Sequence, residues 1–128
     1  MMKTSLAIIC FFALALSLSA QNYPSITIQE LQKIMAVGTV VIIDVNGPKS
    51  YARGHIPTAI DFSSAKNNLT KFLPKDKNTL IVSYCGGPGC RAFKRGADAA
   101  AELGFTNIKY LPGGISGWKR SGAAISKD

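Results

Sequence analysis

The chain is poor in the side chains that bind metal ions. Its 128 residues include a single histidine, His55, and three cysteines, Cys10, Cys85 and Cys90. A structural zinc site generally needs four such ligands at regular spacings, and no set of this kind is present. The sequence therefore predicts no metal site, and it gives no sign of another cofactor.

Acidic residues are also scarce. Seven Asp and Glu residues stand against 15 Lys and Arg residues, which gives a formal net charge of +8. The basic residues are scattered, and no aromatic residues alternate with them to stack on bases. We therefore expect no nucleic-acid partner, whereas the positive field favours a small anionic substrate.

No apolar run is long enough to cross a bilayer. The longest, Leu6–Leu16, falls well short of the roughly 20 residues that a transmembrane helix needs. Lys3 precedes this run and small residues up to Ala20 follow it, which is the pattern of an export signal. We expect cleavage after Ala20, no stable membrane anchor, a periplasmic or secreted protein, and one domain over residues 21–128.

Two cysteines, Cys85 and Cys90, remain after that cleavage. Thiols in an exported protein often pair, so one interpretation is a purely structural disulfide that closes the loop. A bridge that closes so short a loop removes little chain entropy from the unfolded state, which favours a chemical role for the two thiols. Both interpretations stay open at the level of sequence.

Alternating strand and helix signals predict an α/β fold with a mostly parallel sheet covered on both faces. Short apolar runs, each followed by turn residues, predict strands at 40–45, 59–62, 80–84 and 107–111. Amphipathic or alanine-rich segments predict helices at 27–38, 49–53, 64–73, 91–103 and 115–120.

Cys85 follows a buried strand and begins a glycine-rich loop that leads into a helix. The loop consists of Gly86, Gly87, Pro88, Gly89, Cys90 and Arg91. N–H groups of such a loop and of the helix start carry positive partial charge and can stabilise an anionic sulfur. Because ligands gather at the carboxyl ends of parallel strands, the sequence predicts that Cys85 is a nucleophilic thiolate held in an anion cradle.

Four ordered segments resemble the rhodanese-like superfamily: Val41–Val45, Tyr51–Ile60, Tyr84–Cys85 with its loop, and Leu111–Trp118. The resemblance implies a three-layer α/β sandwich, with a central, mostly parallel five-stranded sheet and helices on both faces. It also implies a sulfurtransferase. Cys85 would accept sulfane sulfur from a small anionic donor such as thiosulfate, hold it as a persulfide, and pass it to a thiol or cyanide.

The loop departs from the family's common sulfurtransferase pattern, which has four residues between the cysteine and an arginine. Here four residues separate Cys85 from Cys90, and Arg91 follows. In one alignment Cys90 replaces the arginine and acts as a resolving thiol. The chain could then be a thiol-disulfide redox protein or a persulfide carrier that uses both cysteines and a redox partner protein.

In the other alignment Arg91 closes a loop that is one residue longer. That spacing resembles the loops of cell-cycle dual-specificity phosphatases and related arsenate reductases, and it implies an enzyme that handles a tetrahedral oxyanion. A catalytically idle, partner-binding rhodanese-like module is a further alternative. The presence of Cys85 argues against it, because idle members commonly lack that residue.

Two polar residues outside the loop are candidate supporting residues. Asp44 lies near the end of a predicted strand, where it either orients a loop near the site or accepts backbone hydrogen bonds. His55 is expected to fix a turn rather than to act as a base, because a thiolate stabilised by amide groups needs no base.

Overall fold

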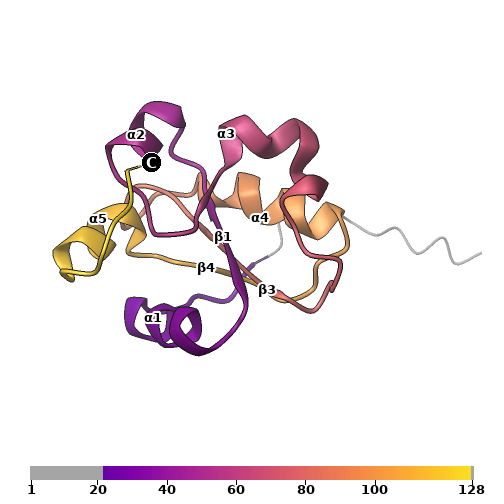
Figure 1. Ribbon diagram of the computed structural model, residues 1–128, viewed down its shortest axis with the longest axis horizontal. Helices are drawn as coiled ribbons and strands as arrows, with labels where there is room; N and C mark the ends of the chain where they lie inside the picture. Colours follow the sequence, from indigo (N-terminus) through magenta and orange to yellow (C-terminus); the bar gives the residue numbers. More distant parts are fainter. Residues whose placement is uncertain (1–21, 128) are drawn as a thin grey trace, which may run out of the picture.

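A parallel sheet with helices on both faces forms the centre of the protein (Figure 1). The computed structural model describes residues 22–127. The predicted export signal, residues 1–20, lies outside the described residues and stays a prediction. Within residues 22–127, no helix combines the length and the apolar character needed to span a bilayer.

The elements follow one another in nearly strict alternation. In chain order they are α1 (Ile28–Val37), β1 (Val40–Asp44), α2 (Pro48–Arg53), β2 (Ile60–Asp61), α3 (Phe62–Ala65), the 3-10 helix η1 (Lys66–Lys71), β3 (Leu80–Tyr84), α4 (Phe93–Glu102), β4 (Ile108–Tyr110) and α5 (Gly114–Arg120). The predicted helix at 64–73 is instead α3 followed by η1, and inside η1 Asn68 takes a non-helical backbone conformation with φ of −138°.

The strands are all parallel and lie in the order β2-β1-β3-β4. The chain leaves β1 toward β2 on one side and returns to β3 on the other, so the order reverses between β1 and β3. Loops at such a switch point diverge and leave room for a ligand at the carboxyl ends of the strands. Residue 85 directly follows β3 at this position.

The expectation of five strands is wrong for the described residues, which contain four. The segment before α1 adds to the free edge of β4 through a single bridge between Ser25 and Tyr110. Two hydrogen bonds hold it there, from the Ile26 N–H to the Tyr110 oxygen at 2.9 Å and from the Tyr110 N–H to the Pro24 oxygen at 3.0 Å. Pro24 has no N–H to extend the ladder, so the fifth strand does not develop.

Alternate residues of the strands divide the core between the two faces of the sheet. On one face Ile42 and Tyr84 pack with Leu31 of α1 and with Ile115 and Trp118 of α5. On the other face a second cluster packs against α4. It contains Ile43, Ile81, Cys85, Phe93 and Ala97. Cys85 therefore lies on the face covered by α4.

Helix α4 packs directly on the sheet because Gly96 has no side chain. A Cβ atom there would lie 2.6 Å from Ser83 Oγ and 2.9 Å from Ile43 Cγ2. The buried Ser83 hydroxyl in turn donates a hydrogen bond of 2.7 Å to the Phe93 oxygen in the first turn of α4. This contact fixes where α4 begins, and hence where the cysteine loop must end.

Candidate functional site

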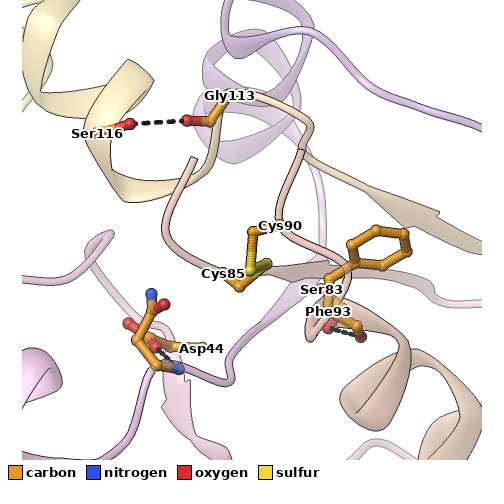
Figure 2. The surroundings of a disulfide bond; sticks show 8 residues. Asp44, Ser83, Cys85, Cys90, Phe93, Gly113 and Ser116 are labelled. Atoms are coloured by element: carbon orange, nitrogen blue, oxygen red, sulfur yellow. Dashed lines mark hydrogen bonds between the residues drawn. A yellow bond between two sulfur atoms is a disulfide. The ribbon is translucent and has the colours of Figure 1, made fainter. Parts of the chain in front are cut away.

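The two cysteines of the loop form a disulfide between Cys85 and Cys90 (Figure 2). The Cα atoms of the two residues lie 6.4 Å apart. Cys85 is only 3% exposed, whereas Cys90 is partly exposed. In this state Cys85 is thus buried and disulfide-bonded. The free thiolate expected from the sequence requires reduction of the bond.

A tight turn brings Cys90 back toward Cys85. The Cys90 N–H donates to the Gly87 oxygen at 3.1 Å, which closes a four-residue turn. Pro88 occupies the second position and Gly89 the third, where its φ of +83° suits glycine. This is the residue pattern of a type II turn. The Pro-Gly pair therefore sets the loop geometry that allows the two sulfurs to meet.

The start of α5 holds the first half of the loop. The N–H groups of Ile115 and Ser116 donate to the oxygens of Cys85 and Gly86, each at 2.9 Å. All peptide bonds in the described residues are trans, and in a trans peptide the N–H points opposite to the C=O. The N–H groups of Gly86 and Gly87 therefore point away from α5.

Those two N–H groups donate to no acceptor within residues 22–127. Figure 2 shows Gly113 and Ser116, at the start of α5, on one side of the disulfide. Two adjacent unpaired donors form a concave site for an anion. The loop thus has two unpaired donors directly after Cys85 in the chain.

Gly114 lets α5 approach the loop closely. Its φ is +56°, and a Cβ atom there would lie 2.5 Å from the Cys85 oxygen and 2.6 Å from the Gly87 nitrogen. Gly87 is similarly restricted, because a Cβ atom would lie 2.5 Å from Ser116 Oγ. These glycines are required by the close approach of two backbone segments.

Two N–H groups at the start of α4 already have acceptors. In its first turn the Lys94 N–H donates to the Arg91 oxygen at 3.1 Å, and the Arg95 N–H donates to the Ala92 oxygen at 3.0 Å. These donors are already used. Arg91 itself is exposed just before the helix, and its side chain makes no ion pair within the described part of the chain.

Asp44 lies on the opposite face of the sheet from Cys85. It is the register partner of Tyr84, whose hydroxyl donates a 2.6 Å hydrogen bond to Asp44 Oδ2. Asp44 Oδ1 accepts the Asn46 N–H at 2.8 Å. Burial raises the pKa of the Asp44 carboxyl, and the hydrogen bonds from Tyr84 and Asn46 oppose this shift in part. Asp44 therefore accepts a backbone hydrogen bond at the end of β1, from the turn that follows the strand.

His55 also has structural partners. It is 2% exposed, its ring stacks on Tyr51 with centroids 3.6 Å apart, and its Nδ1 lies 2.8 Å from the Tyr51 oxygen. The backbone groups of His55 and Ser126 exchange two hydrogen bonds of 2.9 Å. These contacts anchor the tail of the chain and the turn after α2.

A buried amide donor lies beside the loop. Asn46 Nδ2 is inaccessible to solvent and has no hydrogen-bond partner within residues 22–127. Asn46 Oδ1 lies 3.8 Å from the place where a Cβ atom on Gly86 would stand. The turn after β1 therefore brings an unused donor to the region of Gly86, at the switch point of the sheet.

The family model for the rhodanese-like domain matches residues 27–121. The chain belongs to the rhodanese-like domain family. The match runs from the residue before α1 to the residue after α5, so it includes the loop and both elements that hold it. No group of three or more His, Cys, Asp or Glu side chains in the described residues is placed to hold a metal ion.

Solved structures share the fold of this rhodanese-like domain at low sequence identity. A rhodanese-related protein from Thermoplasma volcanium is 23% identical, with a TM-score of 0.62 over 83% of this chain and all of that one. A thiosulfate sulfurtransferase from Pseudomonas aeruginosa is 21% identical, with a TM-score of 0.61 over 81% of this chain and 20% of that one. A 3-mercaptopyruvate sulfotransferase from Escherichia coli is 18% identical, with a TM-score of 0.64 over 84% of this chain and 51% of that one.

The structure brings together the loop residues singled out from the sequence, whereas Asp44 lies on the other face of the sheet from Cys85 and His55 contacts Tyr51. Sequence reasoning missed the contribution of Gly114, Ile115 and Ser116, which orient the loop carbonyls. The sequence does carry a signal for these residues, because the Pro-Gly-Gly-Ile segment is part of the rhodanese-like resemblance. Only the fold shows that this segment lies against the loop.

Proposed function

We propose that this rhodanese-like domain transfers sulfane sulfur through a persulfide on Cys85, after the Cys85–Cys90 disulfide has been reduced. The observation that carries this proposal is the pair of unpaired N–H groups at Gly86 and Gly87, turned away from α5 beside Cys85. Donors fixed in advance stabilise a thiolate and lower its pKa. Membership of the family, which includes sulfurtransferases, supports the same chemistry.

The transfer has two steps that balance in atoms and electrons. The Cys85 thiolate attacks the outer sulfur of thiosulfate, the sulfur–sulfur bond of the donor breaks, and sulfite leaves with the bonding electrons. An acceptor thiolate then attacks the outer sulfur of the Cys85 persulfide and leaves as a persulfide itself, which regenerates the Cys85 thiolate. The basic charge of the protein favours such an anionic donor.

A second candidate function, thiol-disulfide or persulfide-carrier chemistry, is favoured by the disulfide itself. The Cys90 thiolate would attack the inner sulfur of the Cys85 persulfide. The Cys85–Cys90 disulfide forms and hydrosulfide leaves, so the sulfane sulfur departs as sulfide. In this cycle Cys90 is the resolving thiol. An oxidising compartment suits such a disulfide, which supports the proposal that the chain is exported.

Sulfite release and sulfide release from thiosulfate together separate the two candidates. The protein is reduced with dithiothreitol and desalted, and sulfite is measured with cyanide as the acceptor. We expect Cys85→Ala to abolish turnover. Cys90→Ala retains turnover if sulfur transfer from Cys85 is the function.

The same samples are assayed for sulfide without cyanide. Release of sulfide that depends on Cys90 would favour the carrier cycle. Equal sulfite release by the wild type and Cys85→Ala would rule out both candidates.

A further inference from the structure

A cavity of about 460 Å³ opens beside the disulfide, and it reaches only one of the two sulfur-bearing residues. Cys90 lines the cavity together with Gly89 and Arg91. Cys85 does not line it and is 3% exposed. A thiol that enters from solvent therefore meets the Cys90 side of the disulfide, and accessibility helps to decide which sulfur is attacked.

The cavity is cationic. Arg91 and Lys94 line it, and no acidic residue does. Within residues 22–127 the side chains of Arg91 and Lys94 make no ion pair or hydrogen bond. Asp98 lies outside the lining and accepts a 2.6 Å hydrogen bond from the hydroxyl of Tyr23, which does line the cavity. Both cations are thus available to an anionic ligand.

Aromatic rings form a further part of the lining. Phe93 and Tyr110 stack with their ring centroids 4.2 Å apart, and both line the cavity. Such a surface packs well against the carbon atoms of a ligand, while the two cations bind its charged groups. The combination fits a small organic molecule that carries carboxylates better than it fits a bare inorganic anion.

We infer that this cavity is the docking site for a small carboxylate-bearing thiol, which attacks Cys90 and releases Cys85 as the thiolate. The incoming thiolate forms a bond to the Cys90 sulfur, and the Cys85–Cys90 bond breaks with its electron pair passing to Cys85. A second molecule of the thiol then attacks the sulfur of the first, which leaves a free Cys90 thiolate and a disulfide of the two small molecules.

The direction of cleavage agrees with the geometry of the loop. The sulfur that departs belongs to Cys85, the residue directly before the unpaired N–H groups of Gly86 and Gly87, and a stabilised thiolate is the better leaving group. This inference rests on the proposed function, because the docked thiol produces the Cys85 thiolate from which sulfur transfer starts.

Three probe thiols of different charge test the inference on the disulfide form of the protein. They are mercaptosuccinate, which carries two carboxylates, the neutral 2-mercaptoethanol, and the cationic cysteamine. Reduction is stopped at intervals with acid, free thiols are alkylated, and rates are compared per thiolate. We expect mercaptosuccinate to react at least about tenfold faster than 2-mercaptoethanol at low ionic strength. Cysteamine should be the slowest of the three.

A double variant, Arg91→Gln with Lys94→Gln, is compared with Lys71→Gln combined with Lys75→Gln. The second pair removes the same charge from exposed positions outside the cavity. The rate ratio of mercaptosuccinate to 2-mercaptoethanol should fall to about one in the first variant. It should stay unchanged in the second. An unchanged preference in the first variant, or a parallel loss in both, would overturn the inference.

Peptide mass analysis of the early mixed disulfide locates the attacked sulfur. The adduct is expected on Cys90 with the alkyl label on Cys85, and the reverse pattern would contradict the inference.

Sulfur loading of the dithiothreitol-reduced protein by thiosulfate is measured in parallel. If loading succeeds while the adduct lies on Cys85, the docking inference fails alone. If the adduct lies on Cys90 with the expected charge preference while loading fails, the sulfur-transfer proposal fails alone.

Discussion

Tyr84 and Cys85 are neighbours in the chain, yet their side chains lie on opposite faces of the sheet. Tyr84 is fully buried with the cluster under α1 and α5, and Cys85 belongs to the cluster under α4. The alternation of a β-strand imposes this division. One residue therefore stabilises the end of the strand while the next presents a sulfur atom to the loop.

The Tyr84 hydroxyl joins three segments of the chain. It donates to Asp44 Oδ2 at 2.6 Å and accepts the Ile56 N–H at 3.1 Å. Tyr84→Phe leaves both partners buried without this contact, so we expect a loss of about 1–3 kcal/mol in the free energy of unfolding. Urea denaturation measures this loss.

Tyr110→Phe is the matched control, because the Tyr110 hydroxyl has no partner within residues 22–127 and a phenyl ring keeps the stacking on Phe93. That change should cost less than about 0.5 kcal/mol. Equal losses in the two variants would contradict the role assigned to the Tyr84 hydroxyl.

The buried carboxyl of Asp44 predicts a pH dependence of stability. Burial raises its pKa in the folded protein above the ordinary value of 3.8. The native state then binds more protons than the unfolded state between the two pKa values, so this group lowers stability as the pH rises through that window. Asp44→Asn removes the titration.

The difference in free energy of unfolding, Asp44→Asn minus wild type, should accordingly increase as the pH is raised from 3.8 toward neutrality. Urea denaturation at a series of pH values gives this difference. A difference that stays constant or decreases over that range would show that burial does not raise the pKa.

At the scale of elements, the contact between α5 and the cysteine loop controls the site. Gly114→Ala places a Cβ atom 2.5 Å from the Cys85 oxygen and 2.6 Å from the Gly87 nitrogen. Backbone atoms cannot move aside cheaply, so we expect a loss of at least about 1–3 kcal/mol in stability. Sulfur loading of Cys85 should fall with it, as measured by peptide mass after thiosulfate treatment.

Gly113→Ala is the control from the adjacent position. A Cβ atom there meets no atom closer than Ile28 Cδ1 at 3.5 Å, and the φ of −66° suits alanine. This variant should keep both its stability and its sulfur loading. If Gly114→Ala behaved like Gly113→Ala, the close approach of α5 would not matter to the loop.

Much of the element pattern could be predicted from local sequence. The apolar run at Leu80–Tyr84 and the Thr27 cap, whose side chain accepts the Glu30 N–H at 3.1 Å, depend on neighbours along the chain. The position of Cys85 at the end of a strand follows from the same run. The contact of Gly114 with Gly87 could not be predicted, because it joins segments almost 30 residues apart.

The number of strands could not be predicted from local sequence either. Whether the residues before α1 become a fifth strand depends on how they meet Tyr110 and on the missing N–H of Pro24. The pairing of Cys85 with Cys90 likewise depends on the turn geometry of Gly89, which composition alone does not specify.

At the scale of the whole molecule, the disulfide contributes modestly to stability. It joins residues only five positions apart, and the chain-entropy model gives about 2 kcal/mol for so short a loop. Two separate apolar clusters hold the sheet and helices together. We expect the reduced protein to unfold cooperatively in urea, about 2 kcal/mol or less below the oxidised protein. Loss of cooperative unfolding on reduction would indicate that the role of the disulfide is mainly structural.

The central claim is that reduced Cys85 accepts sulfane sulfur. Protein reduced with dithiothreitol and desalted is treated with thiosulfate under anaerobic conditions, and its peptides are analysed by mass spectrometry without further reductant. The account predicts that Cys90→Ala gains the mass of one sulfur atom on the peptide that contains Cys85, and that Cys85→Ala gains none. Sulfur on no peptide, or sulfur retained in Cys85→Ala, would contradict it.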